Sequence, residues 1–314
     1  MKNYTVRPYE SKDFDAWNTF ISKAKNATFL FHRDFMEYHK DRFHDFSLIV
    51  EEDTKWVAVL PANHVEDIVY SHQGLTYGGL VYDEKLNADE VNVVFGNLIL
   101  FLKENNIKTL FYKPIISIYS KKSSLEMDYF LFREKAVLYR KDLNLAIDFS
   151  TEFKISKSKM KHFRRVSELD IEMRKESSFT AFWDKVLIPR LQEKHNTNPV
   201  HTKEEIQFLA EKFPESIVQY NAYFENEIVA GITLFHFGDI VKSQYGATTS
   251  QGEKLRALDF LFINLINEFK DKVSFFDMGT VTEENAQGYN PGLLKQKEEL
   301  GCSVYNQDFY SLSI

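Results

Sequence analysis

Three consecutive strand-like segments in the second half of the chain constrain the fold more than any other feature. The segments 217–224, 228–237 and 240–249 are rich in β-branched and aromatic residues, and polar turns of two or three residues separate them. Strands joined by turns this short pair as an antiparallel meander, because a parallel connection needs a crossover of about a dozen residues. The polar stretch 250–256 then opens an apolar helix pattern at 257–269. We therefore expect an antiparallel sheet whose last meander strand leads into a helix.

Further elements surround this meander. Apolar residues with helical spacing predict a helix around 179–191, which Pro189 kinks or shortens. Thr202 and Glu205 form the capping box of another helix. After the apolar helix we expect a strand, a helix and a final strand or strand pair, at 273–279, 291–300 and 302–314.

The first half of the chain repeats this order of elements. Strand and helix patterns fall at 4–7, 14–21, 33–43, 46–50, 56–63, 88–105, 108–113, 124–133 and 136–147. A length of 314 residues also favours two domains. We place their boundary near 147–153, so that the domains span 1–148 and 149–314. No Pro- or Gly-rich linker marks this boundary, and a single αβ domain with insertions is the alternative.

Composition narrows the class of protein. With 44% hydrophobic and 15% aromatic residues, the chain can bury a sizeable core. The single cysteine, Cys302, excludes a disulfide framework and a cysteine-rich zinc site. No secretory signal is visible at the N-terminus, and the apolar run 93–102 is too short to span a bilayer. We expect a cytoplasmic protein without a transmembrane segment, and peripheral membrane contact stays open.

The charge is distributed unevenly. A formal net charge of −7 argues against a dedicated nucleic-acid-binding protein, and no DNA partner is expected. Residues 154–165, however, carry six basic side chains and no acidic one, which leaves −13 for the rest of the chain. A tRNA would have to contact this stretch, and a solvated helix face or a nucleotide-sugar phosphate site are the alternatives.

Three segments carry a resemblance to a known family. They are YGATTSQGEKLRALDFLFINLI at 245–266, FFDMGT at 275–280 and NPGLLKQKEELG at 290–301. The first is similar to the strand, loop and helix of the GNAT acyltransferase fold. The duplicated pattern and the other two segments resemble the Fem-type (FemABX) aminoacyltransferases of bacterial cell-surface biosynthesis. The resemblance implies an α/β (α+β) fold of two tandem GNAT-like domains, each a mixed, mostly antiparallel central sheet flanked by helices.

The resemblance also implies a donor site at the loop before the apolar helix. In GNAT enzymes this loop presents backbone N–H groups to the pyrophosphate of coenzyme A, and glycines allow the close approach. Here Lys254 and Arg256 stand where the glycines would be, so the loop is degenerate. The expected donor-binding residues are Thr248, Gln251, Gly252, Lys254, Arg256 and Asn290, although Asn290 is also a strong helix cap. Solvated first-turn residues are the alternative for Lys254 and Arg256.

Two residues are candidates for catalysis. Lys297 lies four residues before Gly301, where the resemblance implies a group that stabilises charge during acyl transfer. Asp277 lies at a strand end and could accept a proton from the attacking amine. A surface lysine on an amphipathic helix and a loop-capping aspartate are the respective alternatives.

The acceptor site is expected around the loop between two helices and the strand before the donor loop. Arg190, Glu193, His195, Gln244 and Tyr245 are its candidates, because mixed charged and polar groups suit a polar or anionic acceptor. No metal site is expected, since His195 and His201 lack a metal-binding spacing. In the first half, His32, Arg33 and His72 are weaker candidates for a nucleotide-linked precursor.

The sequence thus favours an enzyme, an N-acyltransferase that acts on an amino group of a peptidoglycan or polysaccharide precursor. The acceptor would be a small or nucleotide-linked molecule, and the donor either aminoacyl-tRNA or an acyl-CoA such as acetyl-CoA. No permanently bound cofactor is expected. A non-catalytic GNAT-fold binding protein with a degenerate donor loop is the alternative from another functional class.

Overall fold

The computed structural model describes residues 2–314, apart from the side chain of His195. The chain divides into two compact units, residues 1–142 with 306–314 and residues 143–305. Our single boundary near residue 148 therefore differs from this division, because the end of the chain returns to the first unit. Strands β8 (Val137–Asp148) and β14 (Ser303–Ser313) each have residues in both units.

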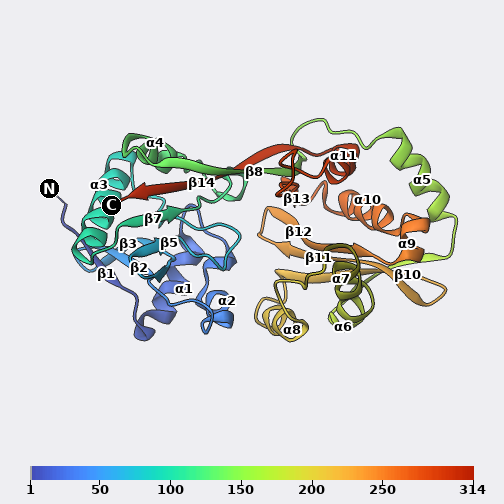
Figure 1. The fold of residues 1–314 in the computed structure, drawn as a ribbon, viewed down its shortest axis with the longest axis horizontal. Coiled ribbons are helices and arrows are strands. Elements are labelled where there is room, and N and C mark those ends of the chain that lie inside the picture. Colours follow the sequence, from blue (N-terminus) through green and yellow to red (C-terminus); the bar gives the residue numbers. More distant parts are fainter. Residues whose placement is uncertain (1) are drawn as a thin grey trace. The chain divides into compact units, whose positions relative to one another are not determined.

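The first unit contains the four-stranded sheet β1-β2-β3-β6 and the strands β4-β5-β7-β14, which belong to a ten-stranded sheet. The strands are β1 (Tyr4–Pro8), β2 (Leu48–Glu52), β3 (Lys55–Leu60), β4 (Asn63–Val65), β5 (Ile68–Tyr70), β6 (Val81–Tyr82) and β7 (Thr109–Tyr112). The helices are α1 (Phe14–Lys23), α2 (Arg33–Met36), α3 (Ala88–Glu104) and α4 (Glu126–Arg133). Figure 1 shows α3 and α4 on the opposite side of the strands from α1 and α2. Buried residues of α3, α4 and the facing strands form one apolar core.

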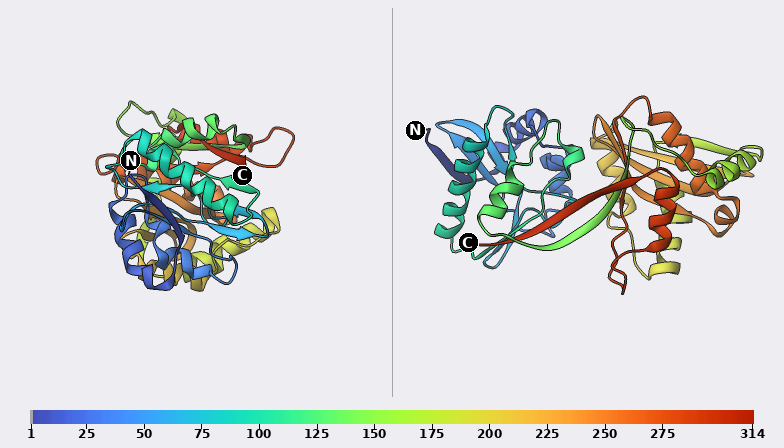
Figure 2. Two further views of the ribbon diagram at one scale, coloured as in Figure 1. Left: turned by 90° about the vertical axis from the view of Figure 1, so that its left-hand side faces the viewer. Right: turned by 90° about the horizontal axis from the view of Figure 1, so that it is seen from above.

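The second unit is built on the strands β8-β13-β12-β11-β10-β9 of this ten-stranded sheet. Its further strands are β9 (Ile171–Glu176), β10 (Ile217–Phe224), β11 (Glu227–His236), β12 (Ile240–Thr248) and β13 (Phe275–Thr280). Its helices are α5 (Lys157–Ser167), α6 (Thr180–Phe182), the π-helix η5 (Trp183–Leu187), α7 (Ile188–His195), α8 (Lys203–Lys212), α9 (Ser250–Leu255), α10 (Ala257–Phe269) and α11 (Pro291–Glu299). In Figure 2, α5, α10 and α11 lie on the side of this sheet that is seen from above. Helix α10 packs against the meander and is apolar around most of its circumference, because its residues fill the core of this unit.

The meander is confirmed. Strands β10 and β11 pair antiparallel, and so do β11 and β12, as the short turns require. Thr202 caps α8 through the predicted capping box, and Asn290 caps α11 with Pro291 in its first turn. Pro189 lies in the first turn of α7, directly after the π-helix, and residues 180–195 stay helical through this point.

The stretch 250–256 and strand β9 are among the elements that differ from the sequence-based expectation. The stretch 250–256, which we expected as a polar loop, forms α9 and then a left-handed residue, Arg256 (φ 59°). Strand β9 was not predicted, because its residues Ile171–Glu176 alternate only weakly and pair at the sheet edge with β10. Edge strands depend on their neighbour more than on their own pattern.

Candidate functional site

Strands β12 and β13 pair in parallel over a short distance that ends at a pair of charged residues. The register partners are Ile240–Phe275, Val241–Phe276 and Lys242–Asp277. Beyond this point both strands are irregular. Strand β12 shifts register against β11 next to Gln244, and β13 shifts against β8 next to Met278. A bulge bends its strand and re-aims side chains, so these two bulges place the charged pair where the regular pairing stops.

Asp277 is the acidic centre of this cluster and is completely buried. Its Oδ1 accepts hydrogen bonds from the Asn144 side-chain amide at 2.9 Å and the Gly279 backbone N–H at 2.7 Å. Its Oδ2 lies 3.7 Å from the Nζ of Lys242, whose side chain is 11% exposed. The carboxylate is therefore held by donors on three segments of the chain, as a buried charge requires.

Lys297, on α11, points its ammonium group at the end of β13. Its Nζ donates to the backbone carbonyls of Gly279 at 2.9 Å and Thr280 at 3.0 Å. Burial lowers the pKa of Lys297 to about 8, and the negative charge of Asp277 partly opposes that shift. An ammonium has three N–H donors, so one remains after these two hydrogen bonds. The predicted catalytic pair, Lys297 and Asp277, is thus brought into one buried cluster.

Two members of this cluster were missed from the sequence. Lys242 follows two buried apolar residues of β12 and is itself buried, and a buried lysine requires a partner. Asn144 lies on β8, and nothing in its local sequence indicates its contact with Asp277. Cys302 lies in the same environment, where burial raises the pKa of its thiol and keeps it protonated.

The predicted donor loop is closed by its own side chains. The Thr249 hydroxyl accepts a hydrogen bond from the Gly252 N–H at 3.0 Å and so caps α9. Gly252 is buried against β11, and Thr248 donates its hydroxyl proton to the Val229 carbonyl at 3.0 Å. Both the backbone N–H and the Cα of Gly252 therefore contact other residues of the protein. Gln251, Lys254 and Arg256 are exposed on this turn, and Asn290 is occupied as the cap of α11.

The predicted acceptor residues form two separate groups. Arg190 makes ion pairs with Glu193 at 2.9 Å and with Glu253 of α9. Glu193 and Glu253 are exposed, and Arg190 is partly buried. The side chain of His195, also predicted here, lies outside the described part of the structure.

Tyr245 belongs to the second group, which is more deeply buried. Its hydroxyl is 2.6 Å from Nδ1 of His201 and accepts a hydrogen bond from the His201 backbone N–H at 3.2 Å. Burial raises the pKa of Tyr245 to about 12, so the phenol stays protonated at neutral pH. Next to it, the buried Oε1 of Gln244 has no hydrogen-bond partner among the described residues. An unsatisfied buried acceptor at a bulge is a group that a ligand can satisfy.

Two of the weaker candidates in the first unit differ in their environment. Arg33 is buried with its guanidinium 3.4 Å from the ring centre of Tyr9 and 2.6 Å from Asp45, which is a structural arrangement. His72 lies beside His39, with ring centres 5.6 Å apart, and burial lowers its pKa to about 3. The Nδ1 of His72 has no hydrogen-bond partner among the residues described.

The basic stretch 154–165 separates into one structural lysine and an exposed cationic face. Lys159 is buried, with its Nζ 2.7 Å from both carboxylate oxygens of Asp259 on α10. Lys157, Lys161, Arg164 and Arg165 are exposed on the opposite face of α5. Within the described part of the chain, these four side chains have no acidic partner in ion-pair distance.

No helix among residues 2–314 is long and apolar enough to cross a membrane. Nor do the described histidine, cysteine and carboxylate side chains include a cluster that could hold a metal ion.

Comparison with known proteins identifies the fold. No protein-family model matches the sequence. No curated protein matches the sequence either. Among solved structures, FemX superposes with a TM-score of 0.71 at 8% identity over 98% of this chain and 97% of FemX. L-PGS from Bacillus licheniformis gives 0.64 at 13% identity over 96% of this chain and 91% of its own. A tandem GNAT protein from the clavulanic acid biosynthesis pathway gives 0.53 at 9% identity, covering 99% and 98%. The predicted tandem GNAT fold and its Fem-type resemblance are confirmed as a likeness of fold.

Proposed function

We propose that this protein is an N-acyltransferase that transfers an acyl or aminoacyl group to an amino group of a cell-envelope precursor. The observation that carries the proposal is the buried ammonium of Lys297, held at the end of β13 with one donor left. Burying an ammonium group is energetically unfavourable, so a lysine in this position indicates a functional role. The confirmed tandem GNAT fold supports acyl transfer as that role.

The proposed reaction forms one C–N bond and breaks one C–O or C–S bond. The acceptor amine attacks the carbonyl carbon of the donor, and the carbonyl electrons move onto oxygen. The remaining N–H of Lys297 stabilises this oxyanion, or protonates the leaving oxygen or sulfur as the tetrahedral intermediate collapses. The proton lost by the acceptor amine then restores the ammonium. A pKa of about 8 suits a group that gives and regains a proton near neutral pH.

Asp277 has a supporting role in this proposal. Its carboxylate is fully buried and already accepts two hydrogen bonds. That environment favours a counter-charge for Lys242 and Lys297 over direct contact with an acceptor amine. Asp277 would then act through Lys297, by favouring its protonated form.

The environment of α9 favours aminoacyl-tRNA over acyl-CoA as the donor. The Gly252 N–H is already bonded to Thr249, and Glu253 places a negative charge on the same turn. Both features oppose a pyrophosphate. The exposed cationic face of α5 offers a few phosphate contacts instead. Acyl-CoA is the competing donor, and Lys254 and Arg256 are the exposed cations that would meet it.

The closed α9 turn also favours a second candidate function, a binding protein that kept the fold and lost donor binding. The two functions differ in what they predict for turnover. We would incubate the protein with labelled aminoacyl-tRNA or acetyl-CoA, together with a UDP-linked muramoyl pentapeptide or glucosamine, and detect the amide product by mass spectrometry. Absence of product in every combination would support the binding protein.

Lys297→Ala tests the catalytic assignment. Lys295→Ala is the matched control, because Lys295 is an exposed lysine on the same helix. We expect Lys297→Ala to lower product formation at least 100-fold, the scale of losing one oxyanion donor, while Lys295→Ala retains full activity. Equal activity of both variants would show that the site is wrongly assigned.

A further inference from the structure

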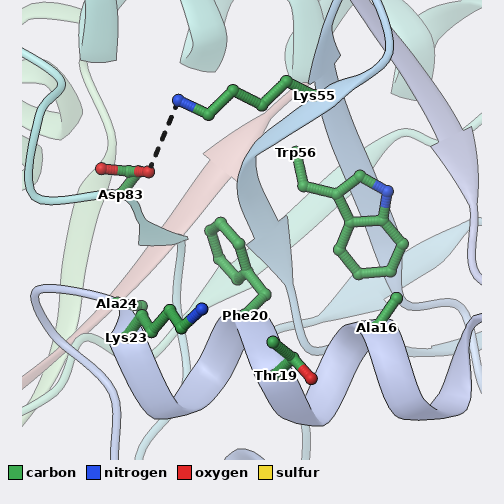
Figure 3. A pocket seen from close by; sticks show the side chains of 8 residues that line it. All are labelled: Ala16, Thr19, Phe20, Lys23, Ala24, Lys55, Trp56 and Asp83. Carbon is green, nitrogen blue, oxygen red and sulfur yellow. Dashed lines mark ion pairs between the residues drawn. The ribbon is translucent and has the colours of Figure 1, made fainter.

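A second candidate site lies in the first unit and shares no residue with the Lys297 cluster. A surface cavity of about 350 Å³ opens between α1 and the start of β3. Figure 3 shows Phe20 and Trp56 side by side in its wall, with small residues such as Ala16 on α1 beneath. A volume near 300 Å³ is the lower limit for small-molecule sites, so the cavity fits one ring system with a substituent.

The aromatic wall is fixed in place by the surrounding structure. Phe20 and Trp56 have ring centres 6.3 Å apart at an angle of 53°. The Arg7 guanidinium lies 5.6 Å from the Trp56 ring centre and is itself bonded to Asp13 at 2.7 Å. Both Phe20 and Trp56 stay partly exposed. Two held but incompletely covered rings form a preorganised surface for a planar ligand.

The charges at the cavity are mainly positive. Lys23 and Lys55 are exposed, and in Figure 3 Lys55 lies above the two rings while Lys23 lies below, next to Phe20. The Lys55 Nζ is 4.0 Å from Asp83, at the limit of an ion pair, while the other Asp83 oxygen accepts the Lys85 N–H. Among the described residues, no carboxylate lies within ion-pair distance of Lys23. One carboxylate therefore offsets two ammonium groups.

We propose that this cavity binds a small planar aromatic anion. Its ring would lie against Trp56 and Phe20, and its carboxylate or phosphate would interact with Lys23 or Lys55. The aromatic wall favours a flat ring, the lysines favour negative charge, and the volume limits the enclosed part of the ligand to about one ring system. A nucleotide and an aromatic carboxylate share this chemistry, and they differ in the anionic group.

Tryptophan fluorescence gives a direct test. Trp17 and Trp183 are fully buried, and Trp56 is partly exposed, so a ligand in the cavity should change the emission of Trp56. We would titrate the full-length protein with AMP and with benzoate, up to 10 mM. The controls for AMP are adenosine, which lacks the charge, and ribose 5-phosphate, which lacks the aromatic ring. The controls for benzoate are benzamide, which lacks the charge, and acetate, which lacks the ring. Saturable quenching by AMP or benzoate but by none of these controls supports the proposal, and the stronger of the two identifies the anionic group.

Variants locate the binding within the cavity. At least one of the variants Lys23→Met and Lys55→Met should raise the dissociation constant about tenfold, as expected for one lost charge-assisted contact. Ala16→Leu should block binding by filling the cavity from an exposed helix position. Trp56→Phe should remove the fluorescence change and keep the thermal shift produced by the ligand. No quenching by either anion, or unchanged quenching in Ala16→Leu, would overturn the proposal.

Discussion

The ammonium of Lys242 and the carboxylate of Asp277 lie 3.7 Å apart across the last register pair that joins β12 to β13. Asp277 is completely buried, and Lys297 approaches the same end of β13 from α11. One carboxylate thus serves two buried ammonium groups. The arrangement links the stability of the second unit to the protonation of the proposed catalytic lysine.

Removing the charge of Asp277 should therefore lower the stability of the folded protein. Asp277→Asn leaves Lys242 and Lys297 without their counter-charge, and breaking a buried pair in this way costs about 3–5 kcal/mol. We expect the free energy of unfolding in urea to fall by this amount. Asp271→Asn, at an exposed position of the same unit, should stay within about 0.5 kcal/mol of the wild type. Equal stability of both variants would contradict a buried charge pair.

The cluster shows which parts of the site can be predicted from a single sequence. Lys297 is a candidate through the resemblance of its segment to Fem-type proteins, and Asp277 through its position at a strand end. The meander is predictable from local sequence, because its short turns require antiparallel pairing. Asn144 comes from a strand more than 130 residues away from its partner Asp277, and only the sheet order β8-β13-β12 brings them together. Contacts of this kind depend on topology and leave no local signal.

The pH dependence of turnover should report Lys297. Its pKa is lowered by burial to about 8, so the proposed active ammonium is lost as the pH rises through 8. We expect kcat/KM to decline above pH 8 with an apparent pKa near that value. Lys297→Arg keeps its charge at this pH, so any residual activity of that variant should not show the decline. A decline that persists in Lys297→Arg would assign the titration to another group.

Stability should change with pH in the opposite direction. Below pH 8 both the folded and unfolded states carry the ammonium, and the folded state bears the full cost of burying it. Between about pH 8 and the ordinary lysine pKa of 10.5, the unfolded state binds more protons. The Lys297 contribution to the free energy of unfolding therefore rises with pH across this window. Urea titrations of the wild type and Lys297→Met, compared at pH 7.5 and 9.5, should show this rise only in the wild type.

The sequence around Lys159 suggests an exposed cation, but the structure buries this lysine. It lies among six basic residues, yet it forms a buried ion pair with Asp259 and is not part of the exposed face. Each single variant, Lys159→Met or Asp259→Leu, should lose about 3–5 kcal/mol of unfolding free energy. The double variant should recover most of this loss, because no unpaired charge remains buried. Additive losses in urea denaturation would exclude coupling between the two residues.

The exposed face of α5 is the place to test tRNA binding without disturbing the fold. Reversing Lys161, Arg164 and Arg165 to Glu removes three exposed cations and leaves Lys159 intact. We expect weaker tRNA binding and a salt dependence whose slope is smaller by about 2–3, with the melting temperature unchanged. Filter binding of tRNA at several salt concentrations measures this slope. An unchanged affinity would place the donor elsewhere or favour acyl-CoA.

Gly252 is among the expected donor-binding residues, but the close approach that the structure shows at this glycine is to the protein itself. A Cβ at this position would lie 2.1 Å from the Val229 carbonyl oxygen and 2.4 Å from the Thr248 hydroxyl. The Val229 carbonyl belongs to β11 in the middle of the sheet and cannot move freely. Gly252→Ala should therefore cost about 1–3 kcal/mol of unfolding free energy, as overpacking does. Gly96→Ala is the matched control, because a Cβ at that position of α3 meets nothing within 4 Å and should stabilise the helix by about 0.5–1 kcal/mol. A Gly252→Ala variant that keeps its stability and loses only donor binding would restore the donor-loop role of this residue.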